Sequence, residues 1–130
     1  MHTAIAESAD PYRHKEIEAR IWRAIEHAQR LGIDVGRYPY GVFESATGNW
    51  VAPTKRVCPL GALMLAEQPI PSKHQMTHQI SELIGKTPEW VRSFCCGVDR
   101  GEDFYEFGIK EAFEMGDSLC EKAKGNCASL

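Results

Sequence analysis

One cysteine stands where a thiol could be chemically active. Cys58 directly precedes Pro59, which opens a helical stretch, and Lys55 and Arg56 come shortly before it. The positive end of a helix and nearby cations both stabilise a thiolate, so the position predicts a lowered thiol pKa and a nucleophile, redox sensor or soft metal ligand. The alternative is a small apolar side chain that anchors a buried helix, because no histidine is spaced to serve as its base.

A helix-turn-helix pattern spans residues 74–96. Ser81 is a small residue four positions before the turn glycine Gly85, and apolar residues recur where two crossed helices would bury them. The pattern resembles the DNA-binding motifs of phage repressors, and the resemblance implies a reading helix in the major groove. The candidate DNA-reading residues are Lys86, Glu89, Arg92 and Ser93.

The charge of this reading face argues against nucleic acid as the favoured partner. One arginine and one glutamate make a poor reader of an anionic groove, and Lys86 occupies a position that is usually apolar in the motif. A plain corner between two helices explains the pattern as well. We therefore expect weak or no DNA binding.

Two histidines, His74 and His78, are four residues apart and would share one face of a helix. Such a pair can hold a metal ion, but no glutamate signature of a metalloprotease surrounds it. Two solvated histidines are the better interpretation, and we expect neither a metal nor a cofactor.

A helix predicted over 103–124 carries a strongly acidic face. From Asp99 to Glu121 there are eight acidic and two basic residues, and the aromatic Phe107 falls among the acids. An exposed aromatic ringed by charge can anchor a partner of opposite charge, although the hairpin or the N-terminal arm could equally cover it. The candidate interface residues are Phe107, Glu106, Glu114 and Asp117.

The elements that must position these residues are mainly helical. Periodicity, caps and breakers predict helices over 11–31, 59–68, 72–85, 87–97 and 103–124. The second is apolar all round, which indicates a buried central helix. Between the first two helices, residues 38–52 predict a β-hairpin whose loop is 45–49. The expected fold is a mainly α bundle of about five helices with one small hairpin.

Length and composition fit one globular domain. The chain has 130 residues, 43% of them hydrophobic and 25% charged, with a net charge of −3. We expect a single helical domain over 1–130, with a mobile N-terminus at 1–10 and a mobile tail at 125–130. No apolar run suits a membrane helix and no export signal is visible, so we expect a cytoplasmic protein whose five cysteines are free thiols.

The expected function is a small non-enzymatic binding or regulatory module that contacts a protein or a small ligand, away from membranes. Two alternatives remain open. One is a DNA-binding regulator that uses residues 74–96, and the other is a thiol-dependent enzyme or a redox or metal sensor centred on Cys58.

Overall fold

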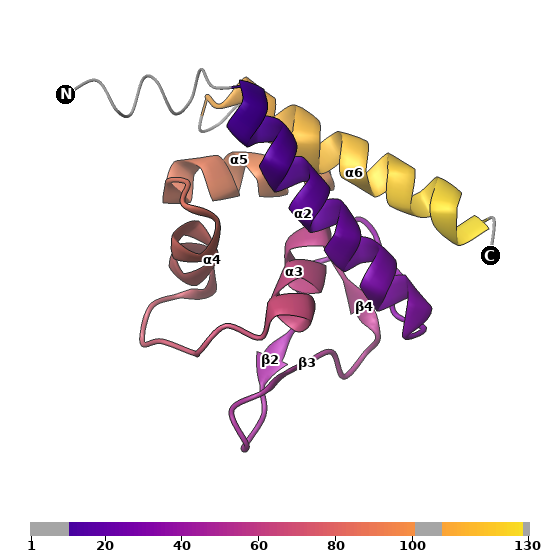
Figure 1. The fold of residues 1–130 in the computed structure, drawn as a ribbon, viewed down its shortest axis with the longest axis vertical. Coiled ribbons are helices and arrows are strands. Elements are labelled where there is room, and N and C mark those ends of the chain that lie inside the picture. Colours follow the sequence, from indigo (N-terminus) through magenta and orange to yellow (C-terminus); the bar gives the residue numbers. More distant parts are fainter. Residues whose placement is uncertain (1–10, 101–107, 129–130) are drawn as a thin grey trace.

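Five helices account for most of the residues that the computed structural model describes, which are 11–100 and 108–128 (Figure 1). They are α2 (Pro11–Arg30), α3 (Pro59–Glu67), α4 (Met76–Ile84), α5 (Pro88–Asp99) and α6 (Lys110–Ala128). Four short strands lie between α2 and α3, namely β1 (Asp34–Val35), β2 (Phe43–Glu44), β3 (Trp50–Val51) and β4 (Arg56–Val57). The structure confirms the mainly α fold with a small antiparallel pair between its first two helices.

Helix α2 forms as its periodicity predicts. Ile17, Ile21 and Ile25 lie on one face and are buried, and α2 packs along the central helix α3 (Figure 1). The chain leaves the helix through Gly32, whose φ of +81° suits glycine. The apolar face of α2 therefore forms one side of the hydrophobic core.

The hairpin is attached to the end of α3. Strands β2 and β3 pair antiparallel, with Phe43 opposite Val51 and Glu44 opposite Trp50. A two-stranded hairpin is marginal alone, but the Gln68 side chain holds this one. Its Oε1 accepts from the Trp50 backbone N–H at 2.7 Å, and its Nε2 donates to the Trp50 carbonyl at 2.9 Å.

A second strand pair was not predicted from the sequence. Strands β1 and β4 pair in parallel, with Asp34 opposite Arg56 and Val35 opposite Val57. Each strand has only two residues, too few for an alternating pattern to show. This pairing brings together the two ends of the segment 34–57, which contains the hairpin.

Helix α4 begins later than the sequence predicts. The sequence predicts a helix over 72–85, but α4 starts at Met76. The side chain of Gln79 accepts from the Ser72 backbone N–H at 3.3 Å and donates to the His74 carbonyl at 2.7 Å. These bonds satisfy the backbone in a turn before the helix, so no helical turn is needed there.

Helix α6 also differs from its predicted bounds. Gly108 has a φ of +75°, which an α-helix cannot contain, and the helix runs from Lys110 to Ala128 rather than from 103 to 124. Residues 101–107 and 1–10 lie outside the described residues. Helix α6 includes residues 125–128 of the predicted tail, and residues 129–130 also lie outside the described residues. No helix in the described ranges is both long and apolar enough to cross a membrane.

Candidate functional site

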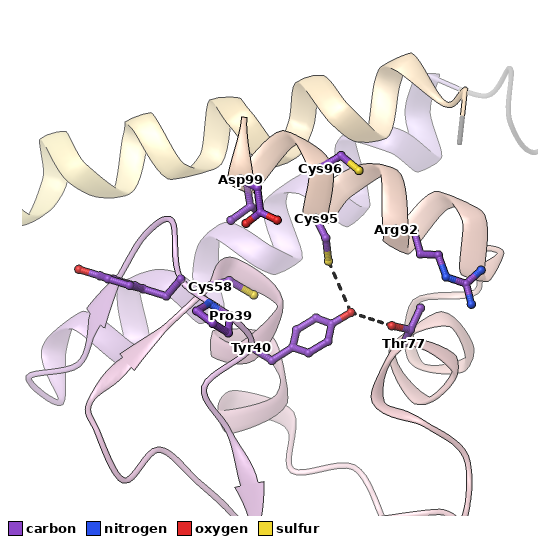
Figure 2. A pocket seen from close by; sticks show the side chains of 10 residues that line it. Pro39, Tyr40, Cys58, Thr77, Arg92, Cys95, Cys96 and Asp99 are labelled. Atoms are coloured by element: carbon purple, nitrogen blue, oxygen red, sulfur yellow. Dashed lines mark hydrogen bonds between the residues drawn. The ribbon is translucent and has the colours of Figure 1, made fainter. Parts of the chain in front are cut away.

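A cavity of about 370 Å³ opens where the loop before the hairpin meets α3, α4 and α5 (Figure 2). Tyr38, Pro39 and Tyr40 of the loop form one side, with Cys58 at the start of α3 and Thr77 near the start of α4. Helix α5 supplies the opposite side with Arg92, Cys95, Cys96, Val98 and Asp99. The wall is thus built from four segments that are far apart in the sequence.

The backbone of the loop fixes the position of Tyr40. The carbonyl of Pro39 accepts from the Cys58 N–H at 3.1 Å, and a Cβ on Gly61 would lie 2.0 Å from the Tyr40 carbonyl oxygen. Gly41 has a φ of +73°, and a Cβ there would lie 2.1 Å from the Arg56 carbonyl oxygen. Two glycines therefore let the loop lie directly on α3 and β4.

A chain of hydrogen bonds crosses the cavity (Figure 2). The hydroxyl of Tyr40 lies 3.0 Å from Thr77 Oγ1, and the thiol of Cys95 donates to the same hydroxyl at 3.5 Å. Burial raises the pKa of Tyr40 far above its ordinary value and raises the pKa of Cys95 to about 11. Both groups are therefore protonated and uncharged at neutral pH.

Cys58 does not have the lowered pKa that its position predicts. The residue is only 2% exposed, and its Sγ accepts from the Gly61 N–H at 3.4 Å as the cap of α3. Burial raises the pKa of the Cys58 thiol, and the backbone hydrogen bonds that would lower it do not compensate. Desolvation in the core outweighs the helix terminus, so the structure favours a neutral thiol at Cys58 over the thiolate that its position predicts.

Opposite charges stand at the two ends of the cavity. Arg92 lies at the same end as Thr77, whereas Asp99 lies at the other end of the same helix face (Figure 2). Seven residues separate them, which is about 10 Å along the helix axis. Arg92 Nη1 is 4.0 Å from the carboxylate of Glu89, one turn earlier in α5.

The proposed DNA-reading residues do not form one exposed face. Helices α4 and α5 do flank a turn at Gly85, with Thr87 capping α5, so the predicted corner is present. Ser93, however, is 2% exposed and cannot reach a groove. Of the other three, Lys86 is half-buried, Glu89 is exposed, and Arg92 lines the cavity.

The two histidines are both exposed. His78 lies in α4, and His74 lies in the turn just before this helix. The ring centroids of His74 and His78 are 6.4 Å apart, and His74 Nδ1 is 3.6 Å from Glu82. Within residues 11–100 and 108–128, no group of three or more histidine, cysteine or acidic side chains could hold a metal ion.

The acidic face is only partly described. Glu106 and Phe107 lie outside the described residues, and Glu114 is exposed on α6. Asp117 Oδ1 accepts from Arg37 Nη2 and from Arg100 Nε, each at 2.7 Å. Asp117 therefore holds parts of this chain together, and the partner surface around Phe107 stays a prediction.

Sequence reasoning missed the residues that organise the cavity. Tyr40 and Thr77 are not among the predicted site residues, and Cys95 is predicted only as one of the five free thiols. One local signal was available in the sequence. Tyr40 lies between Pro39 and Gly41, which restrict the conformation of the loop and so hold its aromatic side chain in one direction. Nothing local indicated that this loop would meet α4 and α5.

Comparison with known proteins found no matching family model, no matching curated protein and no matching solved structure. The function therefore has to be argued from the chemistry of the cavity.

Proposed function

We propose that this protein is a binding module for a small organic ligand of mainly apolar character, held between the 38–40 loop and α5. The observation that carries the proposal is the cavity of about 370 Å³, a size within the ~300–1,000 Å³ of small-molecule sites. Its wall is mostly aromatic, proline, valine and thiol, with few polar groups placed among them. That composition favours burial of an apolar body whose polar groups are positioned by hydrogen bonds.

The protonation of the cavity favours binding over thiol chemistry. Nucleophilic catalysis by cysteine needs a thiolate and a neighbouring base, but burial raises the pKa of both Cys58 and Cys95. Among the residues that the structure describes, no histidine lines the cavity. These observations support a non-covalent ligand rather than a covalent intermediate.

The test uses 2-naphthamide, a neutral planar probe, followed by backbone amide NMR shifts. We expect saturable binding with shifts concentrated at Tyr40, Thr77 and Val98. Cys95→Leu places added bulk in the cavity and should weaken binding at least ~10-fold, since overpacked sites reject volume. Cys95→Ala, the matched control, leaves the space open and should keep the affinity within ~3-fold.

Two results would contradict the proposal. One is a shift pattern centred elsewhere, such as the interface of α2 with α6. The other is that Cys95→Leu and Cys95→Ala bind 2-naphthamide with equal affinity while both unfold at the same thermal midpoint as the parent protein. Added volume in the cavity would then have no effect on binding.

A further inference from the structure

The hydrogen-bond chain leaves one donor for a ligand. Tyr40, Thr77 and Cys95 carry three protons on oxygen or sulfur, and two hydrogen bonds link the three groups. Each bond uses one proton whichever atom donates it, so one proton of the chain is left over. The raised pKa values of Tyr40 and Cys95 keep those protons in place at neutral pH. The hydroxyl pair of Tyr40 and Thr77 therefore offers one hydrogen-bond donor that an acceptor of a ligand can use.

The cavity has a cationic side chain, Arg92, at one end and an anionic side chain, Asp99, at the other. Arg92 and Thr77 both line the cavity, and Figure 2 shows the Arg92 side chain at the end where the hydrogen-bond chain terminates. The far end has the carboxylate of Asp99, at the last residue of α5. Pro39, Cys58 and Val98 supply apolar surface along the wall.

We propose, on the basis of the proposed function above, that the ligand is a small carboxylate with an apolar body, its carboxylate directed at Arg92 and Thr77. A carboxylate accepts in the plane of a guanidinium and also accepts the spare proton of the hydroxyl chain. Asp99 repels the carboxylate of a ligand that enters in the reverse orientation. A cationic ligand would have to place its charge at the exposed Asp99 and leave the spare donor without an acceptor.

Three probes of one shape separate the effect of charge from that of fit. They are 2-naphthoate, 2-naphthamide and 2-naphthamidinium, which carry negative, zero and positive charge on the same ring. We expect the carboxylate to bind the parent protein at least ~5-fold more tightly than the amide, because charge-assisted hydrogen bonds are stronger. The amidinium should bind most weakly.

Variants then assign that preference to Arg92. Arg92→Gln should reduce the affinity for 2-naphthoate to that for the amide and leave the amide affinity within ~2-fold. Arg30→Gln is the matched control, since it removes the same charge from an exposed site at the end of α2. It should leave all three affinities and their order unchanged.

The outcomes distinguish the two proposals. If the amide or amidinium binds as tightly as the carboxylate, or if Arg30→Gln acts as strongly as Arg92→Gln, the carboxylate assignment is overturned while a binding cavity remains. If no probe binds, the proposed function fails and the ligand class fails with it.

Discussion

At the scale of single residues, Cys58 combines two opposing influences on a thiol. Its place before Pro59 at the start of α3 lets the Sγ accept a backbone hydrogen bond, which favours the thiolate. Its burial removes the water that would solvate that charge, and this effect is the larger one. The residue therefore works as a neutral cap and core side chain.

The first prediction concerns the reactivity of this thiol. In native protein at pH 8, iodoacetamide should label Cys58 ~100-fold more slowly than in urea, because the native thiol is both buried and protonated. Labelling at Cys95 should rise about 10-fold per pH unit from pH 7 to 9, since its pKa is about 11. Peptide mapping by mass spectrometry measures both rates.

Two findings would argue against this account. The first is native labelling of Cys58 at the rate seen in urea. The second is a plateau in the Cys95 rate near pH 8.5, the behaviour of an ordinary exposed thiol.

At the scale of elements, the crossing of α5 and α6 depends on two glycines. A Cβ on Gly97 would lie 2.0 Å from the Phe113 carbonyl oxygen, and one on Gly116 would lie 2.2 Å from the Phe94 carbonyl oxygen. Each helix thus presents a glycine to the backbone of the other. Because α5 forms one side of the cavity, this crossing also positions Cys95 and Arg92.

The second prediction follows from these distances. Gly97→Ala and Gly116→Ala should each lower the free energy of unfolding by about 1–3 kcal/mol, because the backbones must separate to admit a methyl group. Gly125→Ala, on the exposed side of α6 with nothing within 4 Å, is the matched control. That change should raise the free energy of unfolding by about 0.5–1 kcal/mol through helix propensity.

Urea unfolding of the three variants gives the comparison. Close packing of the two helix backbones at Gly97 and Gly116 is contradicted if Gly97→Ala and Gly116→Ala are as stable as Gly125→Ala. It is also contradicted if all three lose stability equally, since a general effect of alanine in these helices would then explain the result.

At the scale of the whole molecule, Arg37 links parts of the chain that are distant in sequence. Its Nη1 donates to the Val98 carbonyl at 2.9 Å, and its Nη2 donates to Asp117 and Glu121, each at 2.7 Å. One side chain thus joins the loop after β1 to the end of α5 and the middle of α6. The loop continues directly into Tyr38 and Tyr40, so the network also supports the cavity.

The third prediction is a pH dependence of stability. Partial burial would raise the pKa of Asp117, but hydrogen bonds from Arg100 and Arg37 outweigh it and hold the pKa below its usual value. A hydrogen bond from Arg37 likewise lowers the pKa of Glu121. Their contribution is full above the unfolded-state pKa of ~4 and is lost as the pH falls through the lowered folded-state values.

Asp117→Asn isolates that contribution. At pH 7 the variant should be less stable than the parent by about 0.5–1 kcal/mol, a modest value because the ion pair is partly exposed. The difference should shrink below pH ~4 as the parent's carboxylate is protonated. Glu114→Gln, which removes an exposed carboxylate from the same helix, should show no such pH dependence. A constant difference for Asp117→Asn from pH 7 to 2.5 would contradict the linkage.

The sequence alone determined the helices and the hairpin, because their signals are local. The apolar stripe of α2, the all-round apolar α3, and the cap of α5 at Thr87 each depend on residues within a few positions of one another. The tertiary structure decided the parallel pairing of β1 with β4 and the protonation of Cys58. It also brought Tyr40, Thr77 and Cys95 together from three segments. Burial and desolvation sum contributions from residues that are remote in the chain, so no local pattern could encode them.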